Sequence, residues 1–292
     1  NNNNIGLPFT ILRLKAHEAM VVEMGMNHFG EISLLTDIAK PTLAVITNIG
    51  TSHIGNLGSR KNILKAKLEI LEGMKIPKVI INNDKDKIEI HTVGIENNSE
   101  LMAKSIELGE ESSEFKAIAE KKETEIQVPV AGTHFVYNAL CAMEVGIILG
   151  ISTNQIQNGI AKFELTKKRM DIRKWENGAI IINDAYNASY ESMRASIEFL
   201  ANHTGTRKIT VLGDMFELGE YSKELHEKVG VEVAKNNIDM LVCCGENAKY
   251  IVESAERNGM LKENVNYFEN REQVEKFIRE NWQSGDSVLF KA

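Results

Sequence analysis

Short apolar runs alternate with longer amphipathic stretches along nearly the whole chain, and this alternation constrains the fold more than any other feature. In the first half, three apolar runs predict strands, at residues 19–25, 43–50 and 78–82. An amphipathic stretch at residues 59–73 predicts a helix between the last two runs. Strands and helices that alternate in this way are typical of βα units built around a parallel sheet.

Beyond these units the sequence changes character. Residues 114–130 alternate in polarity and predict an antiparallel excursion from the sheet. The mostly apolar stretch at 133–150 predicts a buried helix. A further helix is expected directly after it, because Ser152 and Gln155 have the spacing of a capping box.

From about residue 166 the rhythm becomes more regular, and it predicts a second doubly wound domain. Strands are expected at residues 179–184, 208–214, 240–246, 265–269 and 287–290, and helices near 190–203, 221–236, 246–258 and 271–282. The expected fold class is therefore α/β, with two doubly wound domains at residues 1–165 and 166–292. The polar stretch 165–174 is the best candidate for the linker between them.

Composition excludes several classes of protein. The 292 residues include 34 Lys and Arg against 41 Asp and Glu, a formal net charge of −7, which argues against binding of nucleic acid or anionic membranes through bulk charge. No apolar run approaches the ~18 residues of a membrane span, and the first residues lack the pattern of a signal peptide, so we expect a cytoplasmic protein. Cys141, Cys243 and Cys244 have no metal-ligand spacing and are expected to be buried, reduced thiols.

Polar residues and glycines follow several of the predicted strands. In open α/β sheets the ligand crevice lies at the carboxyl ends of the strands. Glu23, Asn48 and His53 occupy such positions in the first domain, and Asp184 and Asp214 occupy them in the second. Turn structure is the alternative at each position, since Asn, Asp and Gly are common wherever a strand ends.

Lys67 falls in the middle of the apolar stripe of the predicted helix at 59–73. An ammonium on an inward face must shift its pKa, extend outward along its own stem, or find a partner. The sharper hypothesis is that Lys67 lies under an active site near Glu23 and His53, whose carboxylate and imidazole are suited to share a divalent cation.

The usual phosphate-binding loops are absent from the sequence, which contains neither G-x-x-x-x-G-K-[ST] nor G-x-G-x-x-G. Either the protein uses no nucleotide, or the loop precedes Asn1. The chain starts with Asn and ends in a strand-like segment with no closing element. We therefore expect an internal piece of a longer protein.

Several motifs resemble those of the Mur ligase family, and the first resembles its MurF type in particular. They extend over nearly the whole chain: VVEMGMNHFGEI, AVITNIGTSHIGNLGS, KAKLEI, NNNNIGLPFTILRL, VPVAGTHFVYNAL, KKRMDI, INDAYNASYESM and VLGDMFELGEYSKELH. The resemblance implies a central ATPase domain at 1–165 and a Rossmann-like carboxyl-terminal domain, truncated at its end, at 166–292. A UDP-sugar-binding domain and a G-x-x-G-K-[ST] loop would precede Asn1, and the piece alone would be inactive.

The resemblance also implies roles for individual residues. Glu23 and His53 match the family's Mg²⁺ ligands, and Lys67 matches its carbamylated lysine, whose added oxygens would help to position the metal. His53, Lys67 and Arg169 would be catalytic, with Arg169 reaching the γ-phosphate of ATP. Asn138 would meet the adenine, preceded by His134.

Further matches are expected around the nucleotide and the substrate. Asp184 would bind the ribose hydroxyls, with Tyr186 and Asn187 beside the nucleotide. Residues near the UDP-sugar-peptide would be Asn2, Asn3 and Asn48. Asp214 and Glu217 either face the incoming dipeptide or form turn structure. Two departures from the family pattern, Phe135 in place of Asn and Tyr190 in place of Pro, put local loop geometry in doubt.

The implied activity is an ATP-dependent ligase of the cytoplasm that adds D-alanyl-D-alanine to UDP-MurNAc-tripeptide through an acyl phosphate, in peptidoglycan precursor synthesis. ATP and Mg²⁺ would be its cofactors, and we expect a monomer that binds no nucleic acid and inserts into no membrane. One rival is another ligase of this fold that adds a single amino acid or polyglutamate. The other is a non-catalytic binding module that has lost its ATPase loop.

Overall fold

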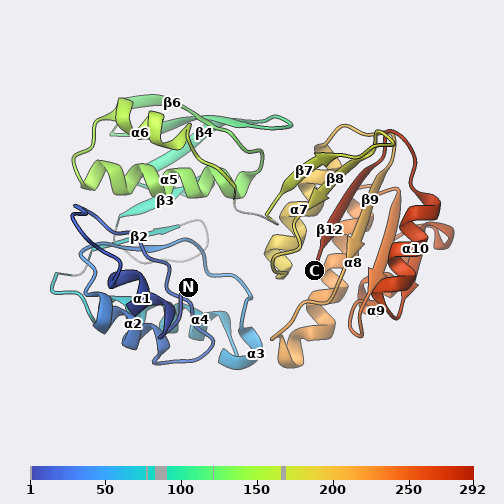
Figure 1. Cartoon of the computed structure of the whole chain (residues 1–292), viewed down its shortest axis with the longest axis horizontal. Helices are drawn as coiled ribbons and strands as arrows, with labels where there is room; N and C mark the ends of the chain where they lie inside the picture. Colours follow the sequence, from blue (N-terminus) through green and yellow to red (C-terminus); the bar gives the residue numbers. More distant parts are fainter. Residues whose placement is uncertain (1, 77, 83–90, 121, 166–168) are drawn as a thin grey trace.

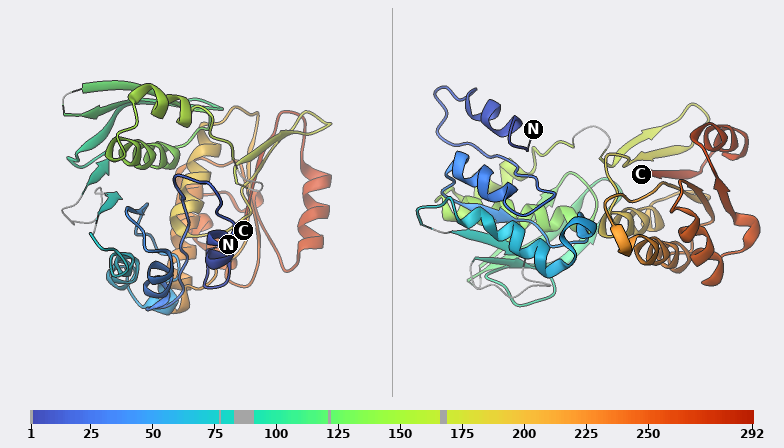
Figure 2. Two further views of the ribbon diagram at one scale, coloured as in Figure 1. Left: turned by 60° about the vertical axis from the view of Figure 1, so that its left-hand side comes forward. Right: turned by 90° about the horizontal axis from the view of Figure 1, so that it is seen from below.

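The computed structural model describes residues 2–76, 78–82, 91–120, 122–165 and 169–292. Two α/β domains lie side by side in it (Figures 1 and 2), and the described residues up to Leu165 belong to the first domain and those from Arg169 to the second. The predicted boundary between residues 165 and 166 therefore adjoins residues outside the described ones, and it stays a prediction.

The first domain is a mixed sheet with the strand order β1-β2-β3-β4-β5-β6. Strands β1 to β4 pair in parallel, and β4, β5 and β6 form an antiparallel meander, as the polarity pattern of residues 114–130 predicts. The strands are β1 (Ala44–Ile46), β2 (Val79–Asn82), β3 (Thr92–Gly94), β4 (Leu101–Leu108), β5 (Ser113–Ala119) and β6 (Lys122–Val128). Strands β3 and β4 have no counterpart among the predicted elements.

The helices of this domain are mostly short. They are α1 (Gly6–Ile11), α2 (Glu31–Ala39), α3 (Ile54–Leu57), α4 (Arg60–Leu68) with the 3₁₀ turn η1 (Glu69–Leu71), α5 (Thr133–Ile148) and α6 (Thr153–Ile160). The apolar helix α5 packs across β2 to β6, and α6 packs on α5 and β6 (Figure 1). The predicted capping box of Ser152 and Gln155 is present at the start of α6.

The strand predicted at residues 19–25 is wrong. This segment has no regular structure, and Val21 is 95% exposed. A strand needs a neighbour that accepts and donates its backbone hydrogen bonds, and no strand of the described residues pairs with this segment. An apolar run alone does not supply that partner, so the segment stays extended and irregular.

The second domain is a nearly all-parallel sheet with the order β11-β10-β9-β12-β8-β7, in which only β7 runs antiparallel to its neighbour. The strands are β7 (Asp171–Lys174), β8 (Ile180–Asn183), β9 (Lys208–Leu212), β10 (Met240–Cys244), β11 (Val265–Phe268) and β12 (Ser287–Lys291). The helices are α7 (Tyr190–Asn202), α8 (Ser222–Lys235), α9 (Lys249–Arg257) and α10 (Arg271–Asn281), with 3₁₀ turns η2 (Gly219–Tyr221) and η3 (Lys262–Asn264). The predicted strands and helices of this domain are confirmed. Strand β7 was not predicted, because it lies within the polar stretch 165–174 that was expected to be a linker.

Both faces of this second sheet are buried, which makes the domain doubly wound as predicted. Helices α7, α8 and α9 pack side by side on one face, where Leu241 and Leu289 are fully buried. On the other face, Val274 and Ile278 of α10 pack against residues that alternate with these along the same strands, such as Val242 and Val288. Cys141 and Cys243 are buried, Cys244 is partly buried, and all three are free thiols.

None of the helices in the described part of the chain is both long and apolar enough to cross a membrane.

Substitution of Gly230 tests the packing of α8 on α9. A Cβ atom at this position would lie 2.3 Å from the carbonyl oxygen of Ile251 and 2.7 Å from the Cβ of Ser254. Overpacking of this kind typically costs about 1–3 kcal/mol, so Gly230→Ala is expected to lower the free energy of unfolding by about that amount in urea titrations. Gly159→Ala in α6 is the matched control, because nothing lies within 4 Å of its added Cβ.

Helix propensity alone should make Gly159→Ala neutral or more stable by about 0.5–1 kcal/mol. A Gly230→Ala variant that is as stable as Gly159→Ala would contradict the packing described for α8 and α9.

Candidate functional site

The carboxyl ends of strands in both sheets face the junction between the domains. The loop that follows β1 contacts the start of α7, where Thr51 donates two hydrogen bonds to one carboxylate oxygen of Glu191. Its backbone N–H lies 3.1 Å and its hydroxyl 2.8 Å from that oxygen. Glu191 lies in the first turn of α7, where the helix dipole favours a carboxylate. The two domains are therefore held together by polar contacts of the residues that follow their strands.

A second set of contacts joins the same loop to the segment after β9. His53 Nδ1 pairs with the carboxylate of Glu217, and the backbone N–H of Gly55 donates to the carbonyl oxygen of Glu217 at 2.9 Å. The hydroxyl of Tyr221 donates to the carbonyl oxygen of Gly58 at 2.7 Å. The predicted metal ligand His53 thus lies at the domain interface, in contact with an acidic side chain of the other domain.

Lys67 is bound from inside the first domain. Its ammonium donates to the carbonyl oxygen of Asn48 at 2.7 Å. Burial lowers the pKa of Lys67, and the negative charge of Glu191 opposes that shift. Of the alternatives open for an inward lysine, the structure shows both a hydrogen-bond partner and a lowered pKa.

The third predicted metal ligand, Glu23, lies in the irregular segment before α2. It is exposed, and one of its carboxylate oxygens accepts a hydrogen bond from the side-chain amide of Asn2 at 2.9 Å. Asn3 has a local role, because its side-chain oxygen accepts from the backbone N–H groups of Ile5 and Gly6 at the start of α1. A substrate role for Asn2 and Asn3 and a metal role for Glu23 stay predictions.

Asp184 lies directly after β8 and is the centre of a buried polar cluster. One carboxylate oxygen accepts from Lys291 Nζ at 2.6 Å and from the hydroxyl of Ser196 at 2.7 Å. The other accepts from the backbone N–H of Met170 at 3.2 Å. The first segment of the second domain and strands β8 and β12 therefore meet at this carboxylate.

The other residues predicted around the nucleotide lie close to this cluster. The guanidinium of Arg169 stacks over the ring of Tyr186, 4.2 Å from its centroid. The backbone carbonyl of Asn187 accepts a hydrogen bond from Lys291 at 2.9 Å, while its side chain accepts from the N–H of Ala188. Tyr186 is 62% exposed, so its stacked pair with Arg169 lies at the surface of the junction.

His134 contributes to the same region from the first domain, in the first turn of α5. Burial lowers the pKa of its imidazole to about 4; the negative charge of Asp184 opposes this shift and the positive charge of Lys291 adds to it. The imidazole is therefore neutral at physiological pH. Of the residues predicted for the nucleotide, Arg169, Asp184 and Tyr186 lie together in the second domain, and the charge of Asp184 acts on His134 of the first domain.

Asn138 lies one turn further along α5, and its side chain is exposed. It lines a mostly apolar cavity of about 440 Å³ between α5 and α6, together with Phe135, Ile156 and Phe163. Phe135, which departs from the family pattern, packs against Phe163 with ring centroids 5.9 Å apart. Phe135 is buried, and the backbone of the first turn of α5 is helical.

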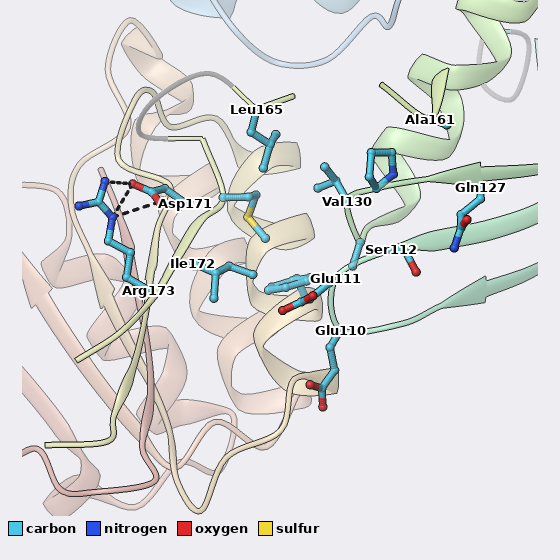
Figure 3. A pocket seen from close by; sticks show the side chains of 14 residues that line it. Glu110, Glu111, Ser112, Gln127, Val130, Ala161, Leu165, Asp171, Ile172 and Arg173 are labelled. Atoms are coloured by element: carbon cyan, nitrogen blue, oxygen red, sulfur yellow. Dashed lines mark hydrogen bonds and ion pairs between the residues drawn. The ribbon is translucent and has the colours of Figure 1, made fainter. Parts of the chain in front are cut away.

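A second cavity, of about 720 Å³, lies where the two domains adjoin (Figure 3). Val130 and Glu111 line it from the first domain, and Ile172, Asp171 and Arg173 line it from β7. Asp171 and Arg173 are paired with each other, with Arg173 Nη2 2.6 Å from a carboxylate oxygen of Asp171. Cavities of this size are typical of small-molecule sites, and this one borders Met170, which contacts Asp184.

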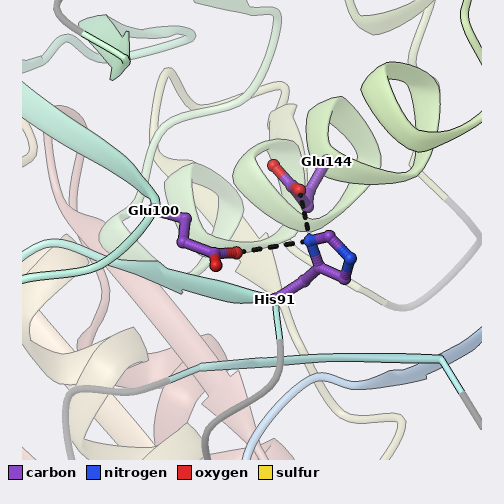
Figure 4. A group of neighbouring side chains, drawn as sticks. All are labelled: His91, Glu100 and Glu144. Carbon is purple, nitrogen blue, oxygen red and sulfur yellow. Dashed lines mark ion pairs between the residues drawn. The ribbon is translucent and has the colours of Figure 1, made fainter.

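Among the described residues, one group of three His, Cys, Asp or Glu side chains is close enough to hold a metal ion, and it contains none of the predicted ligands. It consists of His91, Glu100 and Glu144, with His91 Nδ1 3.3 Å from Glu100 and 3.2 Å from Glu144 (Figure 4). Burial raises the pKa of Glu144, and the neighbouring His91 opposes this shift. The same imidazole nitrogen faces both carboxylates, an arrangement that ties α5 to the starts of β3 and β4 through ion pairs.

Sequence reasoning missed two residues of the junction and left one choice open. Lys291 and Glu191 were missed, although a lysine at the end of an apolar strand was a usable signal for the first.

Asp214 accepts from the backbone N–H groups of Asn247 and Ala248 at 3.0 and 2.7 Å, so it caps the start of the α9 segment and is turn structure. Glu217, by contrast, contacts the other domain.

Comparisons of the sequence with known families give two matches. The description "Mur ligase middle domain" matches residues 1–146, and "Mur ligase, glutamate ligase domain" matches residues 168–292. The chain is 36% identical to UDP-N-acetylmuramoyl-tripeptide–D-alanyl-D-alanine ligase of Bacillus subtilis and 34% identical to that of a Synechocystis species. Each match covers 100% of this chain but only 65% and 64% of those relatives, so the chain spans less than two thirds of their length.

Solved structures are similar over the same extent. A crystal structure of MurF from Acinetobacter baumannii superposes with a TM-score of 0.89 at 30% identity, over 100% of this chain and 65% of that one. A MurF ligase from Thermotoga maritima, crystallised in complex with ADP, gives a TM-score of 0.85 at 26% identity, over 98% of this chain and 67% of that one.

The lowered pKa of His134 predicts a pH dependence of stability. The unfolded chain binds a proton at this imidazole below about pH 6.5, whereas the folded protein binds it only near pH 4, so stability is lost as the pH falls between these values. His134→Gln should remove this loss, which amounts to about 3 kcal/mol at most. Urea unfolding of both proteins at pH 7.5 and pH 4.5 measures it.

The difference between the variant and the wild type at pH 7.5 gives the cost of lost packing, and the other titrating groups cancel between the two proteins. An equal loss of stability in both on acidification would contradict a neutral, buried His134.

Proposed function

Because the chain belongs to the Mur ligase family, we propose that it carries the ATP-binding and carboxyl-terminal domains of a MurF-type enzyme. That enzyme joins D-alanyl-D-alanine to UDP-MurNAc-tripeptide at the expense of ATP, in peptidoglycan precursor synthesis. The observation that carries this proposal is that Arg169, Asp184 and Tyr186 lie together in the second domain, and the electrostatic effect of Asp184 on His134 of the first domain agrees with it. The similarity to ligases of this name over the whole chain supports the choice of substrates.

The proposed reaction begins with activation of a carboxylate, which is a poor electrophile at neutral pH. The terminal carboxylate of the tripeptide attacks the γ-phosphorus of ATP, ADP leaves, and an acyl phosphate forms. The amine of D-alanyl-D-alanine then attacks the acyl carbon, inorganic phosphate leaves, and the amine loses a proton to solvent. Phosphoryl transfer demands mainly positioning and charge neutralisation from the protein.

Within this proposal the chain's own residues bind and orient the nucleotide. Asn138 meets the adenine and Asp184 the ribose hydroxyls, with Tyr186 and Asn187 beside them. The cation of Arg169 reaches the γ-phosphate and offsets the charge that develops there. Since Asn138 and Asp184 belong to different domains, closure of the domains completes the site and excludes water.

Of the predicted ligands in the first domain, the carboxylate of Glu23 has the donor chemistry that fits the Mg²⁺ ion such a reaction uses. Glu23 offers a carboxylate with one oxygen engaged by Asn2, and His53 keeps its Nε2 when Nδ1 pairs with Glu217. Bound there, Mg²⁺ would neutralise charge on the phosphates. Carbamylation of Lys67 is part of the proposal, because the lowered pKa of its amine favours the neutral form that reacts with CO₂. Asn48, whose carbonyl oxygen accepts a hydrogen bond from Lys67, is proposed to lie near the UDP-sugar-peptide.

The gene product that contains this chain tests the proposal directly. It is supplied with ATP, Mg²⁺ and UDP-MurNAc-tripeptide, and with D-alanyl-D-alanine, a single amino acid or glutamate as acceptor. Phosphate release and product mass are measured. Reaction is expected when D-alanyl-D-alanine is the acceptor, and with neither of the other two acceptors. Reaction only with a single amino acid or glutamate would identify another ligase of the fold. If no acceptor supports ATP consumption, the protein would be a non-catalytic binding module.

We also propose that the protein is a cytoplasmic monomer.

The split of nucleotide contacts between the domains predicts the effect of two substitutions. Asn138→Ala and Asp184→Asn should each raise the KM for ATP by roughly tenfold, since the first removes a hydrogen-bonding amide and the second replaces an acceptor oxygen by an NH₂ donor. Asp239→Asn is the control. Asp239 accepts a hydrogen bond from the backbone N–H of Lys208 at the amino end of β9, whereas the proposed nucleotide site lies at the carboxyl ends of the strands. Steady-state kinetics at saturating peptide substrates give the values. An unchanged KM for ATP in both variants would remove these residues from the nucleotide site.

A further inference from the structure

Lys291, the last residue of β12, is a buried lysine that the proposed reaction does not use. Its side chain is 3% exposed. Its ammonium has three donor hydrogens and three acceptors: a carboxylate oxygen of Asp184 at 2.6 Å, the carbonyl oxygen of Asp184 at 3.1 Å and the carbonyl oxygen of Asn187 at 2.9 Å. One ammonium thus fastens both ends of the loop 184–187.

The carboxylate of Asp184 is oriented by these contacts. Each carboxylate oxygen has about two acceptor directions. The oxygen bound by Lys291 also accepts from Ser196, so both of its directions are used. Within the described residues, the other oxygen accepts a hydrogen bond from the N–H of Met170 alone, and so it keeps a direction that a hydroxyl donor would fill.

Burial of a lysine at this position is costly without its partners. An ammonium loses its hydration when it is buried and must be compensated by an anion and by hydrogen bonds. Burial lowers the pKa of Lys291, and Asp184 opposes this shift. Removal of the ammonium would leave Asp184 as a buried carboxylate without its cation, and the two carbonyl groups of the loop without their donor.

We propose that Lys291 is a positioning residue for the nucleotide. Its ammonium holds the loop 184–187 and turns one carboxylate oxygen of Asp184 toward the ribose hydroxyls, while Lys291 itself touches no substrate. The proposal rests on the proposed function, since it assigns a new residue to the same nucleotide site. It follows from the three hydrogen bonds of Lys291 and from the one acceptor direction that they leave on Asp184.

A second ion pair at the opposite end of the same strand provides a matched control. Arg207 binds Asp286, which directly precedes β12, through two hydrogen bonds of 2.9 and 2.6 Å. The side chain of Asp286 is 1% exposed. Both ion pairs fasten β12 within the sheet, but the Arg207 pair lies at the amino end of the strand, away from the loop 184–187. If Lys291 has a purely structural role, its substitution should therefore change stability and the KM for ATP in the same way as substitution of Arg207.

The experiment compares Lys291→Met and Arg207→Met in the gene product that contains this chain. Melting temperature, kcat, and the KM values for ATP and for D-alanyl-D-alanine are measured. Both variants should melt at lower temperature. Lys291→Met should raise the KM for ATP by about tenfold or more, as expected when a binding group is displaced, and leave the KM for D-alanyl-D-alanine unchanged. Arg207→Met should leave both KM values within about twofold of the wild type.

Equal KM values for ATP in the two variants, with an active wild type, would overturn the role of Lys291 and leave the proposed function intact. A wild type that consumes no ATP would overturn both. If Lys291→Met does not fold, Lys291→Arg decides, because it keeps a cation beside Asp184 but does not reproduce the ammonium geometry. It should still raise the KM for ATP, and a wild-type value in that variant would overturn the proposal.

Discussion

Parallel strands place their carboxyl ends at one edge of a sheet, and this constraint determines where both halves of the candidate site lie. In the first domain the residues after β1 form the loop that carries His53 and receives Lys67 at Asn48. In the second domain the residues after β8 and at the end of β12 form the cluster around Asp184. Because the two edges face each other, polar groups from distant parts of the sequence meet without any one segment containing them all.

Burial at this junction keeps one titratable group neutral and two others charged as a pair. His134 is neutral because burial opposes its protonation, whereas Lys291 and Asp184 are buried together as an ion pair with every ammonium hydrogen engaged. A surface ion pair contributes little, but a buried one fixes geometry because its partners cannot turn away into water. The loop 184–187 is therefore held from beneath, while Tyr186 and Arg169 stack above it at the surface.

The sequence predicted the second domain almost completely, and the reason is physical. Its strands are buried on both faces and read as continuous apolar runs, and its helices carry clear amphipathic stripes. In the first domain, the segment at 19–25 reads as a strand but has no pairing partner, and β3 and β4 were missed because one is three residues long and the other carries exposed polar residues.

For the site, the motif resemblance named Arg169, Asp184 and Tyr186, which lie together in the second domain, while the roles of all the site residues stay predictions. Lys291 is marked in the sequence only as a lysine at the end of an apolar strand, and its role depends on the packing of β12 beside β8, which brings together residues more than 100 positions apart.

The interface between the domains includes one contact made by backbone alone. Gly55 and Gly219 approach so closely that a Cβ on Gly55 would lie 2.5 Å from the nitrogen of Gly219. Such a contact breaks and re-forms without any rotamer change, so no side-chain entropy is lost when the lobes dock. Repeated opening and closing would then require no ordering of side chains at this point. Any residue larger than glycine would act as a permanent spacer there and keep the lobes apart.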